Sequence, residues 1–203
     1  MDLLSFLKKC LRGVLLPLPL GLQWAGTGAK IARPRRIQGA KYISIGQGSR
    51  VLPDGELTCL DDYYGQKLRP RLVIGNDVYI GKNACFVCAD SITIEDGCVL
   101  SDHVYISDNA HGMFPENGPI MRQPLILKGQ VRIGRNTFVG YRVVIMPGVV
   151  LGEHCIVGAN SVVTHSYPAH SMIAGVPARL LKEYDPSVND WIDVRLSKRA
   201  KTP

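Results

Sequence analysis

Residues 127–163 read LKGQVRIGRNTFVGYRVVIMPGVVLGEHCIVGANSVV, and this stretch repeats its pattern every six residues. The first position of each repeat is aliphatic, at Leu127, Ile133, Val139, Ile145, Leu151, Val157 and Val163. The fifth position is small or β-branched, at Val131, Thr137, Val143, Val149, Cys155 and Ser161. A period of six fits neither a helix nor the simple alternation of a strand. It predicts a triangular coil of three short strands and about 18 residues per turn, with one aliphatic side chain from each strand pointing inward.

The same pattern extends upstream, so the predicted column is long. Apolar residues recur at six-residue steps in three earlier runs: Ile45, Val51 and Leu57; Ile74, Ile80 and Phe86; Ile94, Leu100 and Ile106. We therefore predict an all-β parallel β-helix over residues 37–182, with a basic and apolar extension over 1–36 and a short C-terminal extension over 183–203. Cys98 and Cys155 fall on the small inward position, which predicts buried free thiols rather than disulfides.

The repeat is interrupted in three places, and an interruption in a solenoid usually marks its working face. Two extra residues near Ala89 and Asp90 indicate a small bulge. Residues 58–73 form a second, less regular break. Residues 107–126 lack the aliphatic repeat altogether, so we expect an excursion loop to leave the column there.

The composition of the 203-residue chain excludes several classes of protein. Lys and Arg outnumber Asp and Glu by 24 to 17, but nine of these bases and only one acid lie in residues 1–50. The rest is nearly neutral and has no basic stripe interleaved with aromatic residues, so we expect no nucleic-acid partner. No apolar run reaches the roughly 18 residues that a membrane-spanning helix needs. The basic, proline-interrupted N-terminus fits an amphipathic segment on a membrane surface better than a signal peptide.

The hexapeptide run, the His of the excursion loop and the sequence AGVPAR at residues 174–179 together resemble the hexapeptide-repeat acyltransferases. The chain is most similar to their sugar O-acetyltransferase branch, which includes galactoside and maltose acetyltransferases and enzymes that modify polysaccharides. The resemblance covers about residues 37–182 and is most specific over 127–182. It implies a left-handed parallel β-helix, acetyl-CoA as co-substrate, and a homotrimer in which the loop of one subunit closes a cleft against the next.

The resemblance assigns His111, at the start of the excursion loop, as the catalytic base. Imidazole titrates near about pH 6.5, so it can accept a hydroxyl proton at neutral pH while the oxygen attacks a thioester. The ring would then return the proton to the leaving thiolate. Asp108 and Glu116 are candidates for orienting the ring. The galactoside enzymes are expected to have a Glu twelve residues after this His, whereas this chain has Gln123.

The resemblance also implies a site for CoA along the last coils. The positions that correspond to its binding residues are Gly140, Tyr141, Ala159, Thr164, Arg179 and Lys182. The first four would border the extended pantetheine, and the two cations suit the CoA phosphates. Gly81 and Ala89 stand where the galactoside branch has polar residues that face the acceptor, so its sugar specificity is not implied.

His165 and His170 suggest a rival function. The γ-type carbonic anhydrases, which are also left-handed β-helices, bind zinc through two His residues five apart and a third His. The pair in this chain lies beyond the last regular repeat, and we expect no metal. The sequence is also compatible with a non-catalytic β-helical scaffold, and with N-acetylation of an amino sugar, since the same base serves an amine.

We therefore expect an acetyl-CoA-dependent transferase that O-acetylates a sugar in a cell-surface polysaccharide or its lipid-linked precursor. The predicted enzyme is cytoplasmic. Its N-terminus is predicted to contact the inner membrane surface peripherally.

Overall fold

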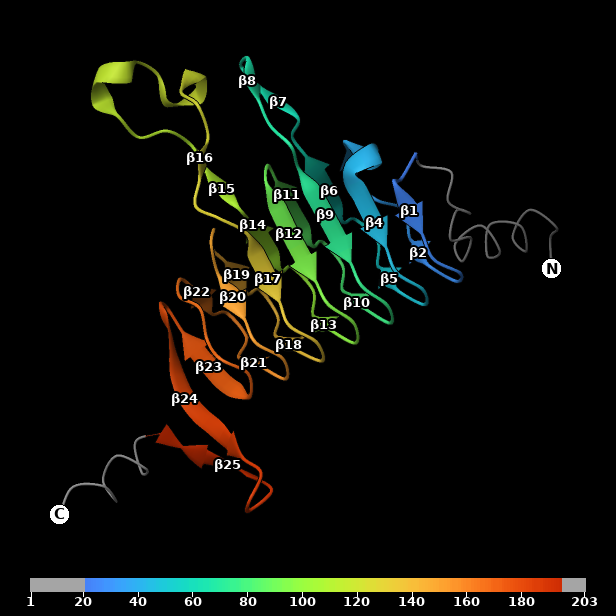
Figure 1. The fold of residues 1–203 in the computed structure, drawn as a ribbon, viewed down its shortest axis with the longest axis vertical. Helices are drawn as coiled ribbons and strands as arrows, with labels where there is room; N and C mark the ends of the chain where they lie inside the picture. The colour runs from blue at the N-terminus through green and yellow to red at the C-terminus, as the bar shows by residue number, and fades with distance from the viewer. Residues whose placement is uncertain (1–20, 195–203) are drawn as a thin grey trace, which may run out of the picture.

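A computed structural model of the chain describes residues 21–194 as a three-sided column (Figure 1). The chain passes from a first face to a second and a third, and then returns to the first. The first face contains β1 (Trp24–Ala25), β4 (Ile43–Ile45), β9 (Arg71–Ile74), β12 (Ser91–Ile94), β17 (Val131–Ile133) and β20 (Val150–Leu151). The second contains β2 (Lys30–Ile31), β5 (Arg50–Val51), β10 (Tyr79–Ile80), β13 (Val99–Leu100), β18 (Phe138–Val139), β21 (Ile156–Val157), β23 (Ser171–Gly175), β24 (Ala178–Asp185) and β25 (Asp190–Asp193). The third contains β3 (Arg36–Gln38), β6 (Glu56–Cys59), β11 (Cys85–Cys88), β14 (Tyr105–Ser107), β19 (Val144–Ile145) and β22 (Val162–Val163).

Short elements lie outside the three faces. They are two antiparallel pairs, β7 (Asp62–Tyr63) with β8 (Gln66–Lys67) and β15 (Asn109–Ala110) with β16 (Ile126–Leu127), and the 3₁₀ turns η1 (Ala40–Tyr42), η2 (Pro115–Asn117) and η3 (Ile120–Arg122). Within residues 21–194, no helix is long and apolar enough to cross a membrane.

The six-residue repeat sets the register of the column. On the first face Ile94 lies opposite Ile74 on one side and Ile133 on the other, so the aliphatic positions of successive coils stack directly. These three side chains are at most 1% exposed, as are the other predicted core positions from Ile45 to Val163, with one exception. Each buried aliphatic side chain contributes about 1.5–3 kcal/mol, so the stability of the column is a sum over coils. The predicted all-β parallel solenoid is confirmed.

The exception is Leu127, for which the prediction was wrong. Its side chain is 41% exposed, because it belongs to β16 and pairs with Asn109 at the base of the excursion loop. The inward repeat resumes at Val131, which is fully buried.

The small inward positions are buried as predicted, and their polar members bond to the backbone of the next coil. Thr137 donates from Oγ1 to the Gly152 carbonyl at 3.1 Å and accepts the Cys155 N–H at 3.2 Å. Cys98 and Cys155 are fully buried free thiols. A small side chain is needed here because the backbone of the neighbouring coil occupies the remaining space.

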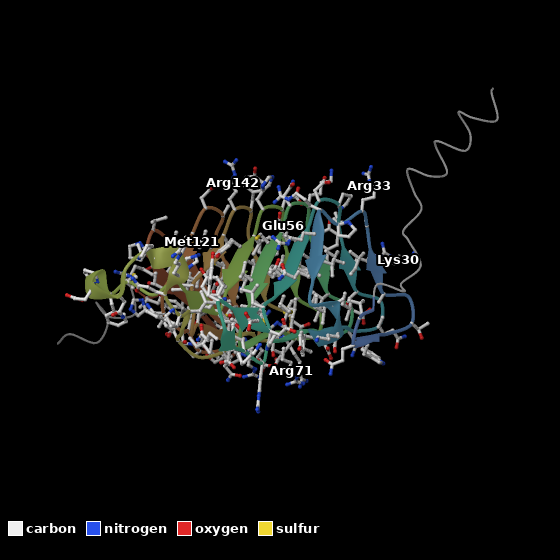
Figure 2. The ribbon with its side chains drawn as sticks, turned by 90° about the horizontal axis from the view of Figure 1, so that it is seen from above. Lys30, Arg33, Glu56, Arg71, Met121 and Arg142 are labelled. Atoms are coloured by element: carbon white, nitrogen blue, oxygen red, sulfur yellow. The ribbon has the colours of Figure 1, made fainter. Side chains whose placement is uncertain are left out.

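Two of the three corners are built from residues in the left-handed region. Such residues are Asp77, Asn136, His154 and His170 at the first corner, between faces one and two, and Asp54, Asn83, His103, Arg142 and Asn160 at the second, between faces two and three. Their backbone N–H groups bond the preceding coil, as His154 N–H does to the Arg135 carbonyl at 2.8 Å. Figure 2 shows two second-corner residues, Arg33 and Arg142, along one edge of the column. His103 and His154 are exposed corner residues, as predicted.

The ladder extends beyond residues 37–182 at its N-terminal end. β1 and β2 pair in parallel with β4 and β5, so strand pairing begins at Trp24. At the other end β24 and β25 add antiparallel strands to β23 and cover the last coil. The N-terminal segment 1–20, on which the membrane prediction largely rests, lies outside the described residues.

Candidate active site

Both long interruptions of the repeat emerge at the third corner, where the chain passes from the third face back to the first. The β7–β8 hairpin follows β6, and the excursion loop follows β14 one coil beyond β11. Figure 1 shows both segments projecting from the same edge of the column. The third corner therefore carries the departures from regularity that the sequence indicated as the working face.

The hairpin holds the returning end of the loop. Gln66 accepts the Leu125 N–H at 2.7 Å and donates to the Leu125 carbonyl at 3.1 Å. Leu125 is buried with Leu68 and Ala89 in a small second core, against which Tyr63 packs. The loop is thereby fixed at a point far along the sequence from its first residue.

Gln123 organises the loop from within. Its side chain, 2% exposed, accepts the Phe114 N–H at 3.0 Å and donates to the carbonyls of Phe114 and Gly118 at 2.9 and 2.8 Å. The galactoside enzymes are expected to have a Glu at this position, whereas this chain has an amide. The amide instead ties together the two sides of the loop.

His111 comes directly after β15 and is exposed at the foot of the loop. Its Nδ1 lies 3.1 Å from the hydroxyl of Tyr63, and the two rings are tilted with centroids 5.8 Å apart. The same hydroxyl donates to the Met121 carbonyl at 2.8 Å. Within residues 21–194, the other ring nitrogen of His111 has no hydrogen-bond partner. Tyr63 lies in the second interruption of the repeat, but nothing in the sequence indicated its contact with His111.

The two acids considered as orienting groups for His111 are used elsewhere or lie apart from it. Asp108 is fully buried, and its carboxylate accepts the N–H groups of Ala89 and Asp90 at 2.8 and 2.9 Å. Glu116 is exposed in η2. In the described part of the chain, Tyr63 is the group at Nδ1.

Two further carboxylates near the hairpin are held in local pairs. The Tyr42 hydroxyl and the Lys41 ammonium lower the pKa of Asp61 by hydrogen bonding. The Lys67 ammonium lowers the pKa of Asp62 in the same way, at 2.9 Å. Both groups therefore remain ionised, and neither suits a role as a proton donor near neutral pH.

The four residues predicted to border the pantetheine of CoA lie at two corners of the column. Gly140, Tyr141 and Ala159 are at the second corner, whereas Thr164, like His111, is at the third. A Cβ on Gly140 would approach the Ala159 nitrogen to 2.7 Å, so these coils are in close backbone contact. One chain therefore does not bring all the predicted donor residues beside His111.

Arg179 and Lys182 share one face of β24. Lys182 lies opposite Met172 and Leu180 opposite Ile173, so Leu181 is an extra, bulged residue. Residues three apart in a regular strand point to opposite faces, and the bulge restores these two cations to the same side. The register thus places the two cations at neighbouring positions on one side of the strand.

His165 and His170, the residues considered as zinc ligands, are not brought together. His165 lies at the third corner with its Nδ1 2.8 Å from Thr164 Oγ1, whereas His170 stacks on His154 at the first corner, with ring centroids 5.5 Å apart. His154, His170, Tyr184 and Trp191 line an open cavity of about 410 Å³. Residues 21–194 contain no group of three or more His, Cys, Asp or Glu side chains placed to hold a metal ion.

Two family models match the chain. One is described as bacterial transferase hexapeptide (six repeats) and covers residues 130–165, and the other, hexapeptide repeat of succinyl-transferase, covers residues 71–107. Together with the parallel three-sided column, these matches confirm the predicted left-handed β-helix.

Named relatives are acetyltransferases. The galactoside O-acetyltransferase of Escherichia coli K12 is 34% identical over 145 residues, which is 70% of this chain and 64% of that protein. The putative lipopolysaccharide biosynthesis O-acetyl transferase WbbJ of the same organism is 29% identical over 59% of this chain and 64% of that protein. The aligned region thus covers less than two thirds of either relative.

Solved structures share the fold. A mutant of AntD, an N-acyltransferase from Bacillus cereus in complex with dTDP and coenzyme A, aligns with a TM-score of 0.66 over 97% of this chain and 94% of that one, at 20% identity. A galactoside acetyltransferase in complex with coenzyme A aligns with a TM-score of 0.51 over 77% of this chain and 66% of that one, at 21% identity.

Proposed function

We propose that the chain is a hexapeptide-repeat acyltransferase, an acetyl-CoA-dependent enzyme that transfers an acetyl group to a sugar with a hydroxyl as the acceptor; the two hexapeptide family models and the relatives named as acetyltransferases support this. The observation that carries the proposal is the imidazole of His111. It is exposed at the foot of a loop that is fixed at both ends, with one ring nitrogen hydrogen-bonded and the other without a partner in residues 21–194. A general base needs a free nitrogen in a fixed position.

The reaction that fits this arrangement is direct transfer. His111 accepts the proton of the acceptor hydroxyl while the hydroxyl oxygen forms a bond to the thioester carbonyl carbon. The carbon–sulfur bond then breaks, and His111 returns the proton to the thiolate. The imidazole thus serves first as base and then as acid, and no covalent intermediate on the protein is required.

The donor would lie along the last coils. Gly140, Tyr141, Ala159 and Thr164 would border the extended pantetheine, and the small side chain of Ala159 leaves the nearby backbone accessible to it. Arg179 and Lys182, on one face of β24, supply two positive charges for the phosphates of CoA. These roles rest on the family resemblance and on the shared face of the two cations.

A homotrimer is part of the proposal, because one chain separates the predicted groups. His111 is at the third corner, and Gly140, Tyr141 and Ala159 are at the second. A neighbouring subunit that presents its second corner to the third corner of the first would complete the site. Each trimer would then contain three equivalent sites.

The acceptor proposed is a sugar in a cell-surface polysaccharide or its lipid-linked precursor. Two relatives named as O-acetyltransferases, one of them assigned to lipopolysaccharide biosynthesis, support a hydroxyl acceptor. The matching assay uses paired sugars that differ only in a hydroxyl or an amino group at one carbon. If only the amino sugar is acetylated, the enzyme is an N-acetyltransferase and the proposed O-acetylation is wrong.

We place the enzyme in the cytoplasm, at the inner surface of the membrane. The support is the basic and apolar N-terminus, with Lys8, Lys9 and Arg12 among leucines. Deletion of residues 1–20 leaves β1 intact and should release the protein from anionic vesicles without loss of activity toward soluble sugars. Unchanged vesicle binding by the truncated protein would refute the membrane contact.

The decisive experiment for the activity is His111→Ala. Acetyl transfer from acetyl-CoA to a sugar panel should fall by roughly 10²- to 10⁴-fold, the usual contribution of a general base. His154→Asn is the matched control, since it replaces an exposed corner His by a residue that tolerates the same left-handed backbone. Full activity of His111→Ala would overturn the proposed mechanism.

A further inference from the structure

The hydroxyl of Tyr63 connects two groups of the excursion loop. It lies 2.8 Å from the Met121 carbonyl oxygen and 3.1 Å from Nδ1 of His111. A carbonyl oxygen only accepts hydrogen bonds, and a hydroxyl has one proton. Both contacts are hydrogen bonds only if Tyr63 donates to Met121 and accepts a proton from His111. The arrangement therefore requires the His111 proton on Nδ1.

We propose that Tyr63 is a positioning residue that holds neutral His111 in the tautomer protonated at Nδ1 and leaves the Nε2 lone pair free to act as the base. The inference rests on the proposed function of His111 and adds to it the residue that fixes the ring. A base with its proton on the wrong nitrogen offers an N–H where the acceptor hydroxyl needs a lone pair.

The scaffold holds the Tyr63 hydroxyl in place independently of the loop's first residues. Tyr63 lies in β7 and packs against the small core of Leu68, Ala89 and Leu125. The hairpin is fixed to the loop by the paired hydrogen bonds between Gln66 and Leu125. The ring of Tyr64 packs edge-on against Tyr63, with centroids 5.0 Å apart. These contacts hold the Tyr63 hydroxyl oxygen in place, and that oxygen in turn orients the His111 ring.

The hydrogen bonds persist through the proposed reaction. When Nε2 takes the hydroxyl proton, the imidazolium still donates from Nδ1 to the Tyr63 oxygen, and Tyr63 still donates to Met121. No proton passes through Tyr63, so it does not itself act as acid or base. Its removal should impair the reaction without abolishing it.

The experiment compares Tyr63→Phe with Tyr64→Phe. Tyr63→Phe keeps the ring and loses the hydrogen bond at Nδ1, so kcat should fall by roughly 10- to 100-fold, the equivalent of one hydrogen bond to a charged group. The KM for acetyl-CoA should change little. Tyr64→Phe removes a hydroxyl one residue away on the same exposed hairpin, and its kcat should equal that of the wild type.

A second measurement reads the tautomer without any assay of activity. In protein labelled with ¹⁵N-histidine, NMR of the neutral His111 ring should show a protonated Nδ1 and an unprotonated Nε2. His111→Ala identifies the resonances. In Tyr63→Phe the proton should redistribute toward Nε2.

The outcomes separate the two claims. An inactive His111→Ala with full kcat in Tyr63→Phe leaves the proposed function standing and overturns the role of Tyr63. A wild-type ring protonated at Nε2 also overturns it. Full activity of His111→Ala refutes the proposed role of His111 as the base and, with it, the positioning role of Tyr63.

Discussion

The Asp108 carboxylate forms hydrogen bonds with the backbone of the preceding coil: it accepts the Ala89 N–H at 2.8 Å and the Asp90 N–H at 2.9 Å. Both contacts lie at the third corner, where Ala89 and Asp90 connect β11 to β12 and the excursion loop begins one coil later. A third donor, the side chain of Asn109, lies 2.9 Å away. Asp108 thus bonds the two corner residues beneath the loop, which explains why an acid three residues before His111 does not contact its ring.

Replacing Asp108 should destabilise the fold. Asp108→Ala leaves the buried Ala89 N–H and the half-buried Asp90 N–H without an acceptor, at a cost of about 1–3 kcal/mol each. We expect the free energy of unfolding in urea to fall by roughly 2–5 kcal/mol. Asp54→Asn, an exposed left-handed corner position, should stay close to wild type. Equal stabilities of the two variants would contradict the structural role of Asp108.

Removing the side chain that fixes the loop to the hairpin should expose the loop to protease. Gln66→Ala breaks both hydrogen bonds to the backbone of Leu125, which is only 6% exposed. Trypsin should then cut after Arg122 several-fold faster, as measured by mass spectrometry. Gln66→Glu keeps the acceptor and loses the donor, so its cleavage rate should be intermediate. Identical rates in all three proteins would show that the loop is held by other contacts.

The column could be predicted from the sequence because every coil repeats the same arrangement of inward-facing residues. Ile133, Val139 and Ile145 occupy equivalent inward positions one strand apart, so periodicity alone fixes their burial and register. The prediction failed at Leu127, where an aliphatic residue keeps the period but lies in the loop. A six-residue period describes the spacing of residues along the chain, and it does not show where the chain leaves the column.

The loop position of His111 was predictable, and the contacts around it were not. Tyr63 and His111 are 48 residues apart and meet only because two irregular segments emerge at one corner. No repeat, motif or spacing encodes that meeting. The same holds for Arg179 and Lys182, whose shared face depends on a bulge at Leu181 that only strand pairing reveals.

Stability at high pH should depend on Cys98. Burial raises the pKa of this thiol from an ordinary value of 9.0 to about 11, so the folded chain keeps its proton while the unfolded chain loses it. The stabilisation is complete below pH 9 and is lost as pH rises toward 11. By pH 11 the wild type should lose roughly 2 kcal/mol more than Cys98→Ala, which has no thiol to titrate.

Urea denaturation of both proteins at several pH values between 8 and 11 checks this difference, because the Ala variant reports the alkaline loss from all other groups. The small cavity left by Cys98→Ala shifts its stability equally at every pH. Parallel stability curves for the two proteins would mean that the thiol ionises alike in folded and unfolded chains.

Arg179 and Lys182 should contribute to acetyl-CoA binding and not to the chemical step. Arg179 is exposed and Lys182 is half-buried, and each cation offers a charge-assisted hydrogen bond to a phosphate, so Arg179→Gln or Lys182→Gln should raise the KM for acetyl-CoA about 5- to 10-fold with kcat nearly unchanged. Arg71→Gln removes the same charge from the first face of the column, on the side opposite Arg142 in Figure 2. If Arg71→Gln raises the KM for acetyl-CoA as much as the two β24 variants do, the effect comes from the loss of net charge, and the shared face of β24 has no specific role. A specific role requires that the KM effect of the two β24 variants persist in 0.5 M salt, where long-range attraction is screened within a few ångströms while direct contacts remain.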